Sequence, residues 1–186
     1  MKNLTSLLLL LLSVYYLNAQ QLSEIDIKIT EYPKTFTDVK DLANLINTDF
    51  DTDEKKARAI YSWIALNVKY DIKAQFSKKR KKRIKYKNQL DRALKLRKQS
   101  LAKINKALHE NKATSEGYAN LFKELCDLSG LYCYTIKGTG KIRTFDIGKQ
   151  PRVLNHSWNV VQINKKWFFI DATLGAGSVD YVEKKY

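Results

Sequence analysis

Two side chains near the end of the chain are spaced to form a histidine–carboxylate pair. Residues 156–163 and 166–173 are rich in β-branched and aromatic types, and they flank Asn164-Lys165, a pattern typical of a two-residue β-hairpin. In that hairpin His156 and Asp171 are diagonal neighbours on one face, within reach of a hydrogen bond. Such a carboxylate fixes the imidazole tautomer and stabilises its cation, as in nucleophilic triads. A third member would have to come from a helix start, where unpaired N–H groups favour an anion.

The elements that must position this pair follow from hydrophobic periodicity. The expected elements are an edge strand over 22–29, helices over 38–46, 53–68 and 115–128, a strand over 131–137 and the hairpin over 156–173. Thr114 is suited to cap the third helix, and Gly130 to end it. Helices followed by strands predict the α+β class, with N-terminal helices packed on an antiparallel sheet.

Three short motifs in these elements resemble the transglutaminase-like superfamily. They are Ser115-Glu116-Gly117-Tyr118-Ala119, His156-Ser157-Trp158-Asn159 and Trp167-Phe168-Phe169-Ile170-Asp171-Ala172-Thr173. The family pattern is Cys-x-Gly-Tyr-Ala at a helix start, then His-x-Trp-Asn, then Trp-x-x-x-Asp-Ala-Thr, and the resemblance covers residues 52–177. It implies a papain-like α+β core, Cys-His-Asp acyl transfer or peptide hydrolysis, and a protein or peptide partner at the cleft. The triad positions it implies are Ser115, His156 and Asp171.

The chain departs from the family at the nucleophile, where Ser115 stands in place of cysteine. Cys126 lies three helical turns downstream and Cys133 in the following strand, so neither can take over; both are interpreted as small buried residues, with a disulfide after export as the alternative. A serine hydroxyl is far more basic than a thiol and needs concerted proton removal. We therefore expect impaired catalysis, with an active Ser115 hydrolase or acyltransferase as one alternative. A helix-start serine with no catalytic role is another.

The net charge of +15 belongs to one segment of the chain. Residues 78–106 hold fourteen lysines and arginines against a single acid, Asp91, and the rest of the chain is close to neutral. Residues 77–110 contain no proline or glycine and carry a thin leucine stripe, which predicts one or two long basic helices projecting from the domain as an insertion.

The basic insertion 77–110 has several possible partners. Anionic envelope polymers or lipid head groups suit its charge, and a cationic envelope-binding protein acting through this segment is an alternative function. Nucleic acid is disfavoured, because the segment has few interleaved aromatic residues and the chain is expected to be exported. A solvated insertion without a partner, or a lid over the cleft, are the remaining interpretations.

Residues 1–19 are typical of a secretory signal peptide. A basic start precedes a short run containing six consecutive leucines, and small Ala19 suits cleavage. No cysteine follows the run, so a lipoprotein anchor is not expected; an uncleaved membrane anchor is the alternative. We expect a secreted or periplasmic domain over 20–186. Because relatives often continue with more strands, a truncated domain is a further expectation.

The composition leaves little room for metal or cofactor chemistry. With two cysteines and two histidines in 186 residues, Cys/His metal sites are nearly excluded, and neither a metal nor a cofactor is expected. At 44% hydrophobic residues the chain can bury a core without such help. The main hypothesis is therefore a secreted transglutaminase-like domain that serves as a binding or scaffold module.

Overall fold

The computed structural model describes residues 23–75, 77, 84–141, 146–150 and 153–177. They form helices, a three-stranded antiparallel sheet and a two-stranded parallel sheet of β1 and β2. The helices are α2 (Glu24–Thr30), α3 (Val39–Asp49), α4 (Asp53–Asn67), α5 (Ile72–Gln75), α6 (Gln89–Glu110), α7 (Ser115–Leu128) and α8 (Ala172–Gly175). The strands are β1 (Lys69–Tyr70), β2 (Lys112–Ala113), β3 (Cys133–Gly138), β4 (His156–Ile163) and β5 (Lys166–Ile170). The expected signal peptide and residues 78–83 of the insertion lie outside the described residues.

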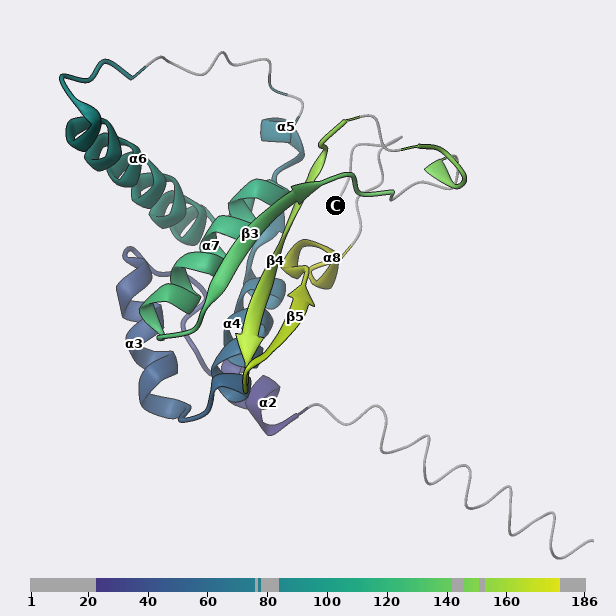
Figure 1. The fold of residues 1–186 in the computed structure, drawn as a ribbon. Helices are drawn as coiled ribbons and strands as arrows, with labels where there is room; N and C mark the ends of the chain where they lie inside the picture. Colours follow the sequence, from purple (N-terminus) through teal and green to yellow (C-terminus); the bar gives the residue numbers. More distant parts are fainter. Residues whose placement is uncertain (1–22, 76, 78–83, 142–145, 151–152, 178–186) are drawn as a thin grey trace, which may run out of the picture.

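Helix α7 is the centre of the fold. It contacts α3, α4 and α6 as well as strands β3 and β4, so it lies between the other helices and the sheet (Figure 1). Leu121, Phe122 and Leu125 on this helix are completely buried. The helix ends as the sequence predicts, because Gly130 adopts a φ of +77° and the Leu131 N–H bonds the Cys126 carbonyl at 2.9 Å. The predicted α+β class with an antiparallel sheet is confirmed.

The sheet has the order β3-β4-β5, with antiparallel neighbours. Asn164 and Lys165 both have positive φ, as a type I′ turn requires, so the predicted hairpin and its register are correct. The hairpin is shorter than predicted, however. Pairing ends at Asn159 opposite Ile170, and Asp171 leaves the strand to begin α8. The reason is that Asp171 caps α8. Its carboxylate accepts hydrogen bonds from two N–H groups of that helix, and its backbone does not pair with β4.

The prediction of an edge strand over 22–29 is wrong, because residues 24–30 form α2. Ser23 caps this helix by accepting a hydrogen bond from the Asp26 N–H at 3.2 Å. An isoleucine at every second position is typical of a strand. In a helix, however, Ile27 points to the opposite side from the isoleucines two residues before and after it. Ile27 is 51% exposed while Ile29 is completely buried, and Asp26 binds Arg58 of α4. Tertiary packing therefore decides between two readings of the same short pattern.

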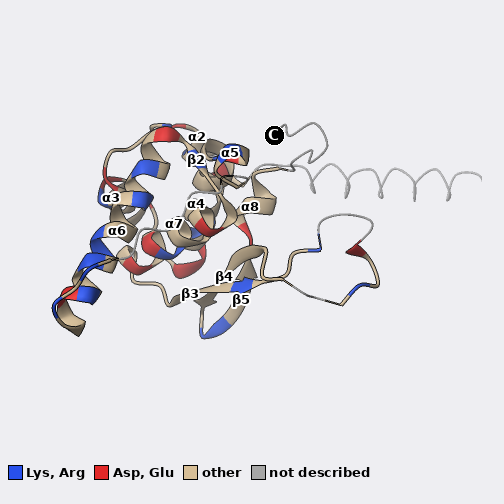
Figure 2. Ribbon diagram, turned by 90° about the horizontal axis from the view of Figure 1, so that it is seen from above, with Lys and Arg blue, Asp and Glu red and all other residues tan. Residues whose placement is uncertain are grey.

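Among the described residues of the basic insertion, Gln89–Glu110 form one long helix, α6. Helix α6 begins after Asn88, whose side chain accepts from the Asp91 N–H at 2.8 Å, and ends at Asn111, which has a φ of +52°. Its C-terminal part packs on α7 and α3, and its N-terminal part projects away from the domain (Figure 1). Lysines and arginines lie along it (Figure 2). In the described residues, every helix is too short or too polar to cross a membrane.

Candidate active site

His156 and Asp171 are joined by a hydrogen bond. His156 Nε2 and Asp171 Oδ2 are 2.6 Å apart, and the two side chains are 11% and 22% exposed. His156 is the first residue of β4, and Asp171 follows β5 and caps α8, so the hairpin and the start of α8 together place the pair. With Nε2 bonded to the carboxylate, Nδ1 is the ring nitrogen that remains for a nucleophile. The pair expected from the sequence is therefore formed.

Three donors converge on the Asp171 carboxylate. Besides the bond to His156, Oδ1 accepts the N–H groups of Thr173 at 3.0 Å and Leu174 at 3.1 Å at the start of α8. Burial by itself would raise the pKa of Asp171, but these hydrogen bonds outweigh it and hold the pKa below its usual value. The carboxylate is thus ionised and fixed in orientation at neutral pH.

A clamp that the sequence analysis missed lies beside the histidine. The Asn155 side chain accepts from the Gly140 N–H at 2.7 Å and donates to the Gly140 carbonyl at 3.2 Å. Gly140 is so close that a Cβ there would lie 3.0 Å from the His156 Cβ. A larger residue at position 140 would push the imidazole out of place. The sequence signal was an asparagine directly before the histidine, but its partner is fifteen residues away.

Ser115 is the first residue of α7 and is only 6% exposed. The helix start is held from both sides: the Tyr118 hydroxyl donates to the Val68 carbonyl, and a Cβ on Gly117 would meet Ala113 at 2.8 Å. Thr114 precedes the helix as predicted, but its side chain makes no capping bond. Among the described residues, no hydrogen bond joins the Ser115 hydroxyl to His156. The structure thus brings His156 and Asp171 together, and it leaves Ser115 without a bond to either.

Asn159 connects the strand that carries the histidine to the helix that carries the serine. It is 1% exposed, and its side-chain amide donates to the Ala119 carbonyl of α7 at 3.0 Å. The same amide lies 3.4 Å from the Thr135 hydroxyl of β3. A buried amide that reaches a helix and a neighbouring strand fixes their relative positions. The sequence motif contained Asn159, but only the fold reveals this role.

Both cysteines are buried and free, at 0% and 4% exposure for Cys126 and Cys133. Burial raises the pKa of the Cys126 thiol, so it stays protonated. Cys126 lies about 16 Å along α7 from Ser115, at 1.5 Å per residue. Neither cysteine can therefore replace the serine. In the described ranges, no three His, Cys, Asp or Glu side chains gather closely enough to hold a metal ion.

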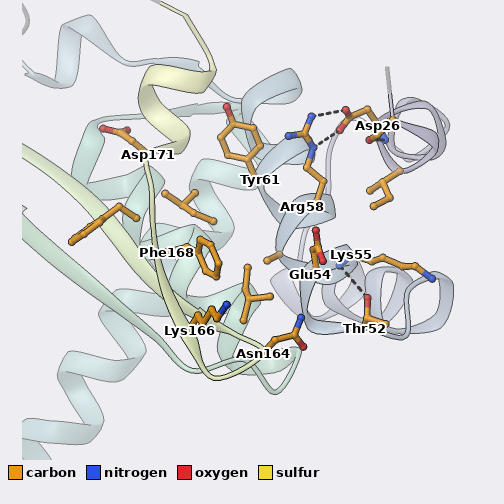
Figure 3. Close-up of a pocket in the computed structure, with 16 residues that line it drawn as sticks. Asp26, Thr52, Glu54, Lys55, Arg58, Tyr61, Asn164, Lys166, Phe168 and Asp171 are labelled. Atoms are coloured by element: carbon orange, nitrogen blue, oxygen red, sulfur yellow. Dashed lines mark hydrogen bonds and ion pairs between the residues drawn. The ribbon is translucent and has the colours of Figure 1, made fainter. Parts of the chain in front are cut away.

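A cavity of about 1430 Å³ opens beside the carboxylate, between the β4–β5 hairpin and helices α2 and α4. Asp171 lies at one end, Tyr61 and Phe168 form apolar walls, and the ion pair of Arg58 with Asp26 lies on the far side (Figure 3). Its lining includes neither Ser115 nor His156. Of the three triad positions, only Asp171 lines the cavity. The cavity is large enough for several residues of a peptide.

Known proteins similar to this chain share its domain. The family model of the transglutaminase-like superfamily matches residues 40–172. Human kyphoscoliosis peptidase is 28% identical over 171 residues, which cover 91% of this chain and 23% of that protein. Hillarin of Drosophila melanogaster is 30% identical over 155 residues, or 78% of this chain and 15% of hillarin.

A solved structure described as a TGase aligns with a TM-score of 0.44 at 16% identity, over 87% of this chain and 36% of that one. The chain spans less than a quarter of the length of the relatives named above. Because the family model covers well over half of its residues, the chain belongs to the transglutaminase-like superfamily.

Proposed function

We propose that this protein is a transglutaminase-like domain with impaired catalysis that acts as a binding or scaffold module of the cell envelope. The observation that carries the proposal is that Ser115 begins α7, where the motif resemblance places the family's nucleophilic cysteine. A helix start and a neighbouring imidazole can ionise a thiol, but a serine hydroxyl needs a base within hydrogen-bond reach. The missing hydrogen bond between Ser115 and His156 supports the proposal.

The intact surroundings of Ser115 favour a binding role over a decayed remnant. The histidine–carboxylate bond, the Asn155 clamp and the buried Asn159 amide are all formed, so the architecture that presents a ligand persists without the nucleophile. The cavity at Asp171 combines apolar walls with charged rims, which suits a protein or peptide ligand.

An active acyltransferase or peptidase is the second candidate, and the 2.6 Å bond between His156 and Asp171 favours it. In that mechanism Ser115 Oγ attacks the acyl carbon while His156 Nδ1 takes the hydroxyl proton. The imidazolium, stabilised by Asp171, then protonates the leaving amine. Water or an acceptor amine releases the acyl group and restores the serine.

Turnover assays separate the two candidates. Peptide and glutamine-amide substrates should show little or no turnover with the wild-type protein, and Ser115→Ala should not change that background. Robust wild-type turnover that disappears in Ser115→Ala would overturn the impaired proposal and establish the serine as the nucleophile.

The Ser115→Cys variant tests whether the site still suits a thiolate. Iodoacetamide should label this thiol at least about tenfold faster than buried Cys126 and Cys133. Ser129→Cys is the matched control, because Ser129 is also 6% exposed but lies at the other end of α7, where the helix dipole disfavours an anion. The rate of labelling at position 115 should be lower in the double variant Ser115→Cys/His156→Ala than in Ser115→Cys. A thiol at position 115 that reacts no faster than that at 129 would contradict a preserved site.

Export is part of the same proposal, and the leader-like composition of residues 1–19 supports it. Mass spectrometry of the exported protein should find an N-terminus near Gln20. Recovery of the protein with Met1–Ala19 attached and embedded in a membrane would contradict it.

A further inference from the structure

The apolar row of α6 is covered along only half of the helix. Leu90, Leu94, Leu101, Ile104 and Leu108 fall on one face at 3.6 residues per turn. Leu108 and Ile104 are 0% and 4% exposed against the domain, whereas Leu94 and Leu90 are 62% and 69% exposed. The same face is therefore a core surface near the C-terminus of the helix and an open apolar surface near its N-terminus.

The boundary between the two halves is an ion pair. Arg97 binds Glu124 of α7 through two nitrogens, at 2.5 and 2.6 Å, and the Glu124 side chain is 5% exposed. Residues 84–98, which we call the α6 tip, are exposed or half-buried, and the helix projects from the domain along this stretch (Figure 1). This two-nitrogen contact ties the base of the tip to α7.

Several cations lie close in sequence to the open leucines. The basic residues of the α6 tip are Lys85, Lys87, Arg92, Lys95, Arg97 and Lys98, against one acid, Asp91 (Figure 2). Lys95 pairs with Asp91 at 2.8 Å and Arg97 with Glu124. The other four make no ion pair among the described residues, and Arg92 lies over the Tyr86 ring at 5.7 Å. The tip is thus both apolar and strongly cationic.

We propose that the α6 tip binds the surface of an anionic lipid bilayer, with Leu90 and Leu94 entering the acyl boundary and the exposed lysines of the tip at the phosphates. A second copy is disfavoured because two tips of equal positive charge repel each other. An acidic polymer would satisfy the cations but leave the leucines in water. A bilayer interface offers an apolar layer below a negative one, which is what cationic amphipathic helices bind. The proposal does not depend on the state of Ser115.

The experiment measures binding of the exported chain to vesicles of phosphatidylcholine with and without phosphatidylglycerol, by co-sedimentation. Wild type should bind only the anionic vesicles. Leu90→Ser/Leu94→Ser should weaken that binding about 10- to 100-fold, since each leucine loses burial in the acyl boundary. Leu96→Ser is the matched control: this leucine is 42% exposed but points to the other side of the helix. All variants share one N-terminus, so any contribution from the leader cancels.

A second pair of variants tests the charge. Lys87→Gln/Lys98→Gln should weaken binding to anionic vesicles, as added salt also should, because fewer cations face the phosphates. Lys165→Gln/Lys166→Gln removes the same charge at the exposed hairpin turn and should bind nearly as wild type. Circular dichroism checks that each variant is folded. Equal binding to neutral vesicles, wild-type binding by the serine double variant, or dimerisation through the tip would each overturn the proposal.

Discussion

The candidate site around His156 and the α6 tip differ in how their polar groups are paired. At the candidate site, Asp171 accepts from three donors and the Asn155 side chain binds Gly140 beside the histidine, so each of these polar groups has a partner within the domain. In the α6 tip four of the six cations make no ion pair within the described residues, and exposed leucines lie on the same helix.

Substitutions in the two regions should therefore affect different properties of the protein. A group with buried partners cannot be changed without leaving one of them unsatisfied, which costs free energy of unfolding. An exposed group costs little to change, so its effect should be seen in binding rather than in stability. The predictions below test this contrast with pairs of variants.

The largest effect is expected within α6 itself. Leu108→Ala should lower the free energy of unfolding by about 2–5 kcal/mol, because the side chain is completely buried against the domain. Leu94→Ala, on the same face but 62% exposed, should change it by no more than about 0.5 kcal/mol. Chemical denaturation measures both. Similar losses for the two variants would mean that the tip is covered in solution.

Loss of the ion pair at the base of the tip should have the next largest effect. Arg97→Ala leaves the buried carboxylate of Glu124 without its partner, at a cost of about 1–3 kcal/mol. The control is Lys95→Ala, which breaks an exposed pair with Asp91 one helical turn away and should cost about 0.5 kcal/mol or less. Equal costs in urea unfolding would show that Glu124 is hydrated and that the base of the tip is not fixed.

The Asn155 clamp should contribute about 1 kcal/mol, the net value of a typical hydrogen bond. Asn155→Ala is therefore expected to lower stability slightly and, in the Ser115→Cys background, to slow alkylation because the histidine is less firmly held. Asn120→Ala is a suitable control, since Asn120 is half-buried on α7 and outside the clamp. An unchanged alkylation rate would show that Gly140 keeps its place without the amide.

The smallest effect is expected on the pH dependence of the free energy of unfolding. The pKa of Asp171 is lower in the folded protein than in the unfolded chain, so its contribution is complete above about pH 4 and is lost as the pH falls through the folded pKa. Asp171→Asn should therefore flatten the loss of stability between neutral pH and pH 3, measured by urea unfolding. If Asp171→Asn and wild type lose stability in parallel, the carboxylate is not held as described.

Much of the candidate site could be read from local patterns. The β-hairpin follows from two β-rich runs around Asn164-Lys165, and this local geometry alone places His156 near Asp171. The start of α7 at Ser115 follows from its apolar periodicity and from the family motif. The Asn155–Gly140 clamp could not be predicted in this way, because its partners come from a loop whose path depends on tertiary packing.

The α+β class, the helix over 115–128, the hairpin turn and the confinement of charge to one segment follow from local patterns, because they depend on periodicity and composition over a few residues. That residues 24–30 form a helix depends on packing, since the burial of Ile29 and Asp26 against α4 selects a helix over a strand. The tertiary structure also decided that Asp171 turns away from the sheet to cap α8. For α6, the sequence supplied one continuous leucine row, and the extent of α7 decided which half of that row is core and which half remains open.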